Sequence, residues 1–136
     1  MDMKAINEQV IRQHRAGEEL GVPGMHRERI VLLTTTGAKS GRPTTAPMLF
    51  VPSDAAIIVI ASNDGAPRPP QWYRNLLADP AVHVEEPGRE YDGISRVLDG
   101  DEHSRTWAML IAGYPFLVDQ QEKAGRELPL VEIVEA

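Results

Sequence analysis

Two apolar, β-branched runs joined by a short polar segment constrain the fold of this chain more than any other feature. Residues 30–33 precede the polar segment and residues 46–51 follow it, and Gly37 and Gly41 lie within it. Glycine-containing polar segments between two such runs are typical of β-hairpins. We therefore expect an antiparallel strand pair in the first half of the chain.

The turn of this hairpin also carries Lys39, Ser40 and Arg42 within four residues. Backbone N–H groups exposed beside glycine, a hydroxyl and two cations together form a plausible cradle for a phosphate. The alternative is a plain turn in which glycine supplies the positive φ and the polar side chains face water. The residues alone leave both interpretations open.

The remaining elements alternate between helices and short strands. The expected order is helix, three strands, helix, two strands, helix and strand, over residues 5–20, 30–33, 46–51, 55–62, 71–78, 81–85, 90–98, a helical region after Asp99 and 128–134. The run at 55–62 is the most apolar and is predicted to be buried on both faces. Short connections favour antiparallel pairing, so we predict an α+β fold, a small and mostly antiparallel barrel with flanking helices.

The domain organisation expected is a helical arm over residues 1–25 and one barrel domain over residues 26–136. The apolar stripe of the arm is narrow, which predicts loose docking. Asp99 and Glu102 have the spacing of a capping box for the late helix. Gly113, Tyr114 and Pro115 are expected to interrupt that helix, with a second piece over residues 116–123.

Composition excludes several classes of function. The chain has 136 residues and a net charge of −6, which argues against nucleic-acid binding by general electrostatics. It has no cysteine, its four histidines are widely spaced, and no metal site is predicted. Ala38 before Lys39 excludes a P-loop, and no G-x-S-x-G motif is present. Without a membrane-length apolar run or a signal peptide, we expect a cytoplasmic protein, with peripheral membrane contact left open.

A series of motifs in one order resembles the deazaflavin-dependent nitroreductase family. The motifs span residues 33–43, 60–65, 72–80, 114–115 and 126–129, and the resemblance covers about residues 29–133. It implies a split β-barrel related to the FMN-binding, pyridoxamine-oxidase-like proteins. It also implies the deazaflavin coenzyme F420 and hydride transfer from the reduced coenzyme to an electron-poor acceptor.

The resemblance also implies roles for individual residues. The coenzyme phosphate and acidic tail would contact Lys39, Ser40 and Arg42, with Gly37 and Gly41 allowing close approach of the backbone. Further cofactor contacts would come from Pro47, Met48, Ser62, Asn63, Gly65, Trp72 and Tyr73. Tyr114 and Ser62 are the predicted catalytic residues, each able to donate a hydrogen bond to an acceptor oxygen.

The resemblance leaves the acceptor and the assembly open. Leu117 and Gln120 stand where related sequences commonly carry aromatic residues, and Ala38 replaces a further cation. The expected acceptor is a conjugated enone or lactone, a quinone or a nitro compound, and the protein a monomer or homodimer. The alternatives are an FMN-dependent oxidoreductase of the same barrel class and a non-catalytic coenzyme-binding protein.

Overall fold

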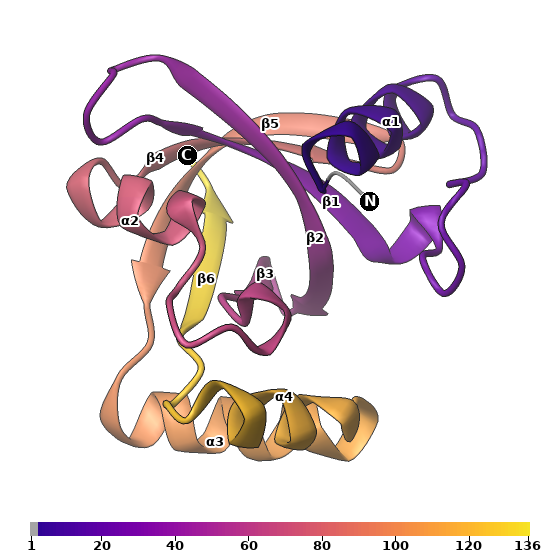
Figure 1. Cartoon of the computed structure of the whole chain (residues 1–136). Coiled ribbons are helices and arrows are strands. Elements are labelled where there is room, and N and C mark those ends of the chain that lie inside the picture. The colour runs from indigo at the N-terminus through magenta and orange to yellow at the C-terminus, as the bar shows by residue number, and fades with distance from the viewer. Residues whose placement is uncertain (1–2) are drawn as a thin grey trace.

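The computed structural model describes residues 3–136 (Figure 1). In chain order its elements are α1 Met3–Arg15, η1 Arg27–Arg29, β1 Ile30–Thr36, β2 Pro43–Ser53, β3 Ala56–Ile60, η2 Asn63–Gly65, α2 Gln71–Ala78, β4 Ala81–Glu86, β5 Arg89–Val97, α3 Gly100–Gly113, α4 Phe116–Ala124 and β6 Leu130–Glu135. The predicted order of helices and strands is therefore confirmed.

The strands form a closed, fully antiparallel barrel in the order β1-β2-β3-β6-β5-β4. The predicted hairpin is present, with Ile30 opposite Leu49 and Thr36 opposite Pro43. The last strand closes the barrel because β6 pairs with β3 on one side and with β5 on the other. The predicted α+β barrel with flanking helices is confirmed.

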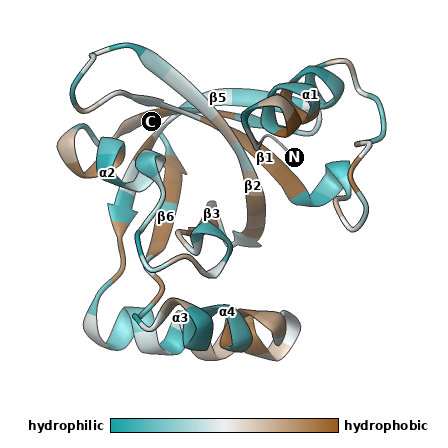
Figure 2. Cartoon of the chain, viewed as in Figure 1, coloured by the Kyte–Doolittle hydropathy of each residue, from teal (hydrophilic) through white to brown (hydrophobic). Residues whose placement is uncertain are grey.

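The barrel interior is built from alternate residues of the strands. Val31, Leu33, Val59 and Val131 are fully buried in it, and β1 and β6 are largely hydrophobic in Figure 2. Helix α2 covers one end of the barrel by inserting Trp72, together with Leu76, into the same cluster. Burial of this apolar surface is the main favourable term in folding.

A second apolar cluster lies between the outside of the barrel and the pair α3–α4. Ile58, Ile60 and Leu130 face this cluster from the strands, and Leu110 and Leu117 face it from the helices. Strand β3 therefore has one face in the barrel interior and the other under α3–α4. The prediction of a strand buried on both faces is confirmed.

The N-terminal arm differs from the prediction in length and in docking. Helix α1 ends at Arg15 because Gly17 adopts φ +72° and the N–H of Glu18 donates to the carbonyl of Gln13, a typical helix termination. The helix is also firmly packed: Val10 is fully buried with Ile30, and His14 is 2% exposed. The prediction of loose docking was wrong, because the arm adds a buried polar contact to its narrow apolar stripe.

In the helical region after Asp99, the structure confirms the predicted interruption at Tyr114 but not the predicted capping box at Asp99. Helix α3 ends before Tyr114 and α4 begins at Phe116, as predicted. The side chain of Asp99 makes no capping hydrogen bond, and Glu102 instead forms a bidentate pair with Arg96 of β5. The predicted capping box was therefore wrong.

Within residues 3–136, no helix combines the length and the hydropathy that a membrane crossing requires.

Candidate functional site

The turn between β1 and β2 is closed by its own backbone. The N–H of Gly37 donates to the carbonyl of Arg42 at 2.8 Å, and the N–H of Gly41 donates to the carbonyl of Gly37 at 2.9 Å. A Cβ at Gly37 would overlap Oγ of Ser40 and lie 3.2 Å from the carbonyl oxygen of Arg42, and Gly41 has φ +71°. The positive φ favours glycine at position 41, and crowding disfavours a side chain at position 37.

The side chain of Asn75, on α2, holds this turn in place through hydrogen bonds. Its Oδ1 accepts from the N–H of Ala38 and from Nε2 of Gln71, and its Nδ2 donates to Oγ1 of Thr35, all at 3.0 Å. Asn75 is 1% exposed. Sequence reasoning gave Asn75 no role, although it lies in the motif over residues 72–80 that carries the family resemblance.

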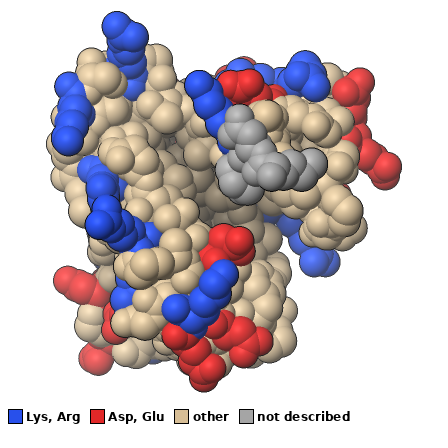
Figure 3. All heavy atoms as spheres, in the orientation of Figure 1, with Lys and Arg blue, Asp and Glu red and all other residues tan. Residues whose placement is uncertain are grey.

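The turn presents unpaired donors and cations. Within the described residues, Lys39 and Arg42 form no ion pair, and the amides of Lys39 and Ser40 make no hydrogen bond. Oγ of Ser40 accepts from the N–H of Arg42 at 3.1 Å. Figure 3 shows Lys and Arg side chains along the edge formed by this turn and α2, beside a hollow in the same face. Such a turn is suited to an anionic group.

The segment after β3 has an unusual backbone. Asn63, Asp64 and Gly65 have φ of +47°, +54° and +78° in succession. Nδ2 of Asn63 donates to the carbonyl of Arg68 at 3.0 Å, which folds the segment back on itself. Asparagine and aspartate enter the left-handed region more readily than other residues with side chains, and glycine does so freely, so this sequence suits the conformation.

Arg126 fastens this segment, and sequence reasoning gave it no role although it lies in one of the motifs. Its guanidinium donates to the carbonyls of Ala61, Ser62, Ala66 and Arg68 over 3.1–3.4 Å. The partners lie about sixty residues away in the sequence, so no local pattern indicates the contact.

The other predicted cofactor residues lie around α2 and β2. Trp72 is only 8% exposed and packs into the barrel interior, whereas Tyr73 is half-buried at its edge. Met48 packs against the same interior cluster, and Pro47 is half-buried on the other face of β2. Trp72, Tyr73 and Met48 therefore contact one interior cluster, and Asn75 links the β1–β2 turn to the helix that carries Trp72.

Tyr114 lies apart from the turn, at the junction of α3 and α4. Its half-buried ring packs against the outer cluster and meets the ring of Phe116 edge-on, with centroids 6.3 Å apart. Its hydroxyl makes no hydrogen bond to residues 3–136, and Ser62 lies on the segment that Arg126 holds. A shared catalytic role for Tyr114 and Ser62 stays a prediction.

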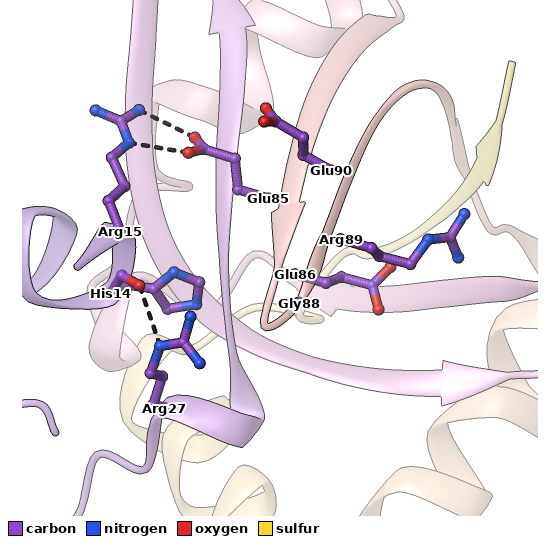
Figure 4. Close-up of a pocket in the computed structure, with 8 residues that line it drawn as sticks. All are labelled: His14, Arg15, Arg27, Glu85, Glu86, Gly88, Arg89 and Glu90. Carbon is purple, nitrogen blue, oxygen red and sulfur yellow. Dashed lines mark hydrogen bonds and ion pairs between the residues drawn. The ribbon is translucent and has the colours of Figure 1, made fainter. Parts of the chain in front are cut away.

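A separate pocket of about 570 Å³ lies between α1 and the β4–β5 hairpin (Figure 4). It is lined by His14, Arg15, Arg27, Glu85, Glu86, Gly88, Arg89 and Glu90. Its charges already have partners: Arg15 binds both carboxylate oxygens of Glu85, and Arg89 pairs with Glu135. None of the predicted site residues lines this pocket.

Two of the histidines, His14 and His83, form hydrogen bonds to other parts of the barrel and its hairpins. His14 bonds the carbonyl of Ile30 through Nε2 at 2.8 Å, and burial lowers its pKa. His83 lies between Asp92 and Glu90, whose carboxylates raise its pKa. No group of three or more potential metal ligands occurs in the described part of the chain.

Comparison with known proteins identifies the class. The family model for F420H(2)-dependent quinone reductase matches residues 5–135. A Mycobacterium tuberculosis protein provisionally described as the F420H(2)-dependent quinone reductase Rv3178 is 31% identical over 101 residues, 74% of this chain and 85% of the relative. This chain belongs to the F420H(2)-dependent quinone reductase family.

Solved structures agree with this membership. An F420-H2 dependent reductase, FDR-A, is 35% identical with a TM-score of 0.69, covering 77% of this chain and 93% of the other. At the level of the fold alone, the likeness extends to a Listeria innocua protein provisionally described as a pyridoxamine 5'-phosphate oxidase. That protein is 13% identical with a TM-score of 0.55, covering 79% of this chain and 83% of the other. The family resemblance and the split-barrel fold predicted from the sequence are confirmed.

Proposed function

We propose that this protein is an F420-dependent reductase that transfers a hydride from the reduced coenzyme to a quinone-type acceptor. Family membership supports the coenzyme and the class of acceptor. The observation that carries the proposal for this chain is the β1–β2 turn, which offers two cations and two backbone amides that have no partner among residues 3–136, in an acidic protein. These donors match a coenzyme that carries a phosphate and an acidic tail.

The residues present fit such a coenzyme in two further respects. Gly41 has open space around the position of a Cβ, so the backbone there can be approached closely. On α4, Oε1 of Gln120 is buried and accepts no hydrogen bond from residues 3–136. A buried acceptor without a donor is costly, and an N–H or O–H group of a bound molecule would satisfy it.

The chain's own contribution would be binding and orientation, while the bound coenzyme would supply the redox chemistry. Lys39, Ser40 and Arg42 would hold the phosphate and tail, and Asn75 would keep their turn in shape. Ser62, on the strained segment, would face the ring or the acceptor. The apolar surroundings of Trp72 would exclude water, which strengthens the remaining polar contacts.

The acceptor, the location and the assembly are further parts of the proposal. A quinone is the acceptor that the family name supports, and enones, unsaturated lactones and nitro compounds are further electron-poor candidates. We place the protein in the cytoplasm as a monomer or homodimer. A role for the hydroxyl of Tyr114 toward the acceptor oxygen is retained as part of the proposal.

A fluorescence titration with coenzyme F420, run in parallel with FMN, tests the coenzyme-binding role of Lys39. We expect Lys39→Ala to weaken F420 binding by about tenfold to a hundredfold, the loss expected for a charge-assisted hydrogen bond. The thermal unfolding midpoint should stay the same because the Lys39 side chain is exposed. Arg105→Ala, an exposed change on α3, is the control and should bind normally.

Each alternative has its own outcome in this experiment. Normal F420 binding by Lys39→Ala would show that the phosphate lies elsewhere. Preference for FMN would support the flavin-dependent alternative. Tight F420 binding without oxidation of the reduced coenzyme by any quinone, enone or nitro compound would support a non-catalytic coenzyme-binding protein.

A further inference from the structure

The pocket between α1 and the β4–β5 hairpin takes no part in the proposed function, yet its volume of about 570 Å³ is that of a small-molecule site (Figure 4). Three arginines and three glutamates line it, so its formal charges balance. The balance is not uniform within the pocket, because Arg27 and His14 lie together away from Glu85 and Glu90 (Figure 4). This end of the pocket is therefore considered by itself.

The carboxylates of the pocket are already bonded to other protein groups. Glu85 accepts from Nε and Nη2 of Arg15 at 2.9 and 3.0 Å. The other two glutamates bond to the hydroxyl of Tyr91 at 2.5 Å and to the ring of His83 at 2.8 Å. None of the three therefore neutralises Arg27.

Arg27 differs from the other lining arginines because its partner is a carbonyl and not a carboxylate. Its Nε donates to the carbonyl oxygen of His14 at 3.1 Å, near the end of α1. Among residues 3–136, its Nη1 and Nη2 donate to no protein atom, and no ion pair includes it. The half-buried guanidinium thus keeps open the edge that binds a carboxylate through two parallel hydrogen bonds.

The ring of His14 supplies a hydrogen-bond acceptor beside this cation. Its Nε2 lies 2.8 Å from the carbonyl oxygen of Ile30, and because a carbonyl can only accept, Nε2 carries the hydrogen. Burial, with a smaller effect of Arg27, lowers the pKa of His14, so the ring is neutral at pH 7. Nδ1 is therefore an unprotonated acceptor, and it bonds to no atom of residues 3–136.

The Nδ1 atom of His14 faces the pocket although the side chain is only 2% exposed. In the described part of the chain, Oε1 of Gln120 is the one side-chain polar atom that lacks a partner and is also sealed from solvent. Nδ1 lacks a partner as well, so it must be reachable from solvent. Because His14 lines this pocket, the accessible part of its ring opens into it, beside the guanidinium of Arg27 (Figure 4).

We propose that this pocket binds a small α-hydroxycarboxylate, whose carboxylate pairs with Nη1 and Nη2 of Arg27 and whose hydroxyl donates to Nδ1 of His14. The two groups are neighbours in such a molecule, as the cation and the acceptor are neighbours in the pocket. A plain carboxylate would leave Nδ1 without a donor, and a neutral alcohol would leave Arg27 without a counter-charge. The site goes beyond the proposed function and does not depend on it.

A bound molecule would also connect two separate parts of the fold. His14 belongs to α1, and Arg27 belongs to the η1 turn that leads into β1. A ligand that binds only the folded protein raises its thermal unfolding midpoint as the ligand concentration rises. We therefore expect the ligand to stabilise the docking of α1 against the barrel.

The direct test compares L-lactate with propionate, which is the same carboxylate without the hydroxyl. Both are titrated into the ¹⁵N-histidine-labelled protein at pH 7, and the ring nitrogens are followed by NMR. We expect lactate to bind about threefold to tenfold more tightly, the effect of one hydrogen bond, and to shift the Nδ1 resonance of His14. Equal affinities, or no response of His14 to lactate at millimolar concentration, would overturn the proposal.

Two further measurements on the wild-type protein test whether the site is specific. Sodium chloride at matched ionic strength should leave the Nδ1 resonance in place, and an equal response to chloride would overturn the assignment. Coenzyme F420 should bind with the same affinity in the presence of saturating lactate. Competition between the two molecules would show that the pocket is not a separate site.

The role of Arg27 is tested with Arg27→Gln, whose amide can still donate to the carbonyl of His14 but carries no charge. We expect about a tenfold to hundredfold loss of lactate affinity, the loss of a charge-assisted pair. Arg12→Gln, an exposed change on α1 outside the pocket, is the matched control and should bind normally. Wild-type lactate affinity in Arg27→Gln would overturn the proposal, and the lactate–propionate comparison tests it without any variant.

Discussion

Gly65 illustrates how a single residue fixes the geometry of the candidate site. It combines φ +78° with a position where a Cβ would lie 2.8 Å from the side chain of Lys123. Gly88 has a similar φ of +86° but open space around it. An alanine at Gly88 therefore meets only the strain of the positive φ, whereas an alanine at Gly65 meets the same strain and steric crowding as well.

This difference gives a prediction for two alanine substitutions. We expect Gly88→Ala to lower the free energy of unfolding by about 1–2 kcal/mol through backbone strain alone. Gly65→Ala should lose about 1–3 kcal/mol more, because the new methyl group displaces Lys123 from the carbonyl of Asp64. Urea unfolding of both variants measures the difference. Equal losses would show that Lys123 moves aside without cost.

At the scale of the element, helix α1 is attached to the barrel by a buried histidine as well as by apolar packing. Burial lowers the pKa of His14, and the cations Arg27 and Arg15 act in the same direction, whereas the carbonyl of Ile30 and the carboxylate of Glu85 raise it. In the unfolded chain the pKa returns to about 6.5. Neutral His14 therefore favours the folded state.

The sign of the pH dependence follows from linkage. Because the folded pKa is the lower one, the contribution of His14 is complete above pH 6.5 and declines as the pH falls from there through the folded pKa. His14→Gln keeps an N–H donor for Ile30 but cannot ionise. We expect its unfolding free energy to depend less steeply on pH in this acidic range than that of the wild type. Parallel curves would contradict the prediction.

The difference in unfolding free energy between the wild type and His14→Gln isolates the effect of His14, because both proteins retain His83. The pKa of His83 is raised by Asp92 and Glu90, so its contribution has the opposite sign: it is complete below pH 6.5 and is lost as the pH rises through the folded value. Urea unfolding monitored at several pH values gives both curves. The difference between them reports only on the docking of α1.

At the scale of the whole molecule, β6 closes the barrel and joins its two halves. Ile133 is fully buried in the barrel interior, and its neighbour Val134 points outward with 39% of its surface exposed. We expect Ile133→Ala to cost about 2–5 kcal/mol of unfolding free energy and Val134→Ala less than about 1 kcal/mol. Denaturant unfolding measures both. Similar losses would show that the interior relaxes around the cavity.

The predictable part of the molecule was its local structure. The hairpin around Gly37 and Gly41, the helix at 71–78 and the break at Tyr114 each follow from signals within a few residues. Helix α1 was predicted too long because the signal of Gly17 was overlooked. Asp99 and Glu102 had the right spacing for a capping box, but Arg96 from another element bound Glu102 instead.

The residues of the β1–β2 turn were selected from the sequence because glycine, lysine and serine at that spacing carry their own chemistry, and their role in binding stays a prediction. Asn75 and Arg126 were not assigned a role, because they act through backbone atoms far away in the sequence. An asparagine in a helix or an arginine before a strand has no local feature that reveals such partners.

By itself, the sequence determined the class of fold, the order of the elements, the cationic turn and the family, since all of these depend on spacing along the chain. Only the tertiary structure decided that β6 closes the barrel, that α1 docks through His14, that Asn75 bonds the β1–β2 turn and that Arg126 bonds the segment after β3. Those features depend on contacts between residues far apart in the chain, and such contacts form only when the barrel closes and its buried polar groups find partners.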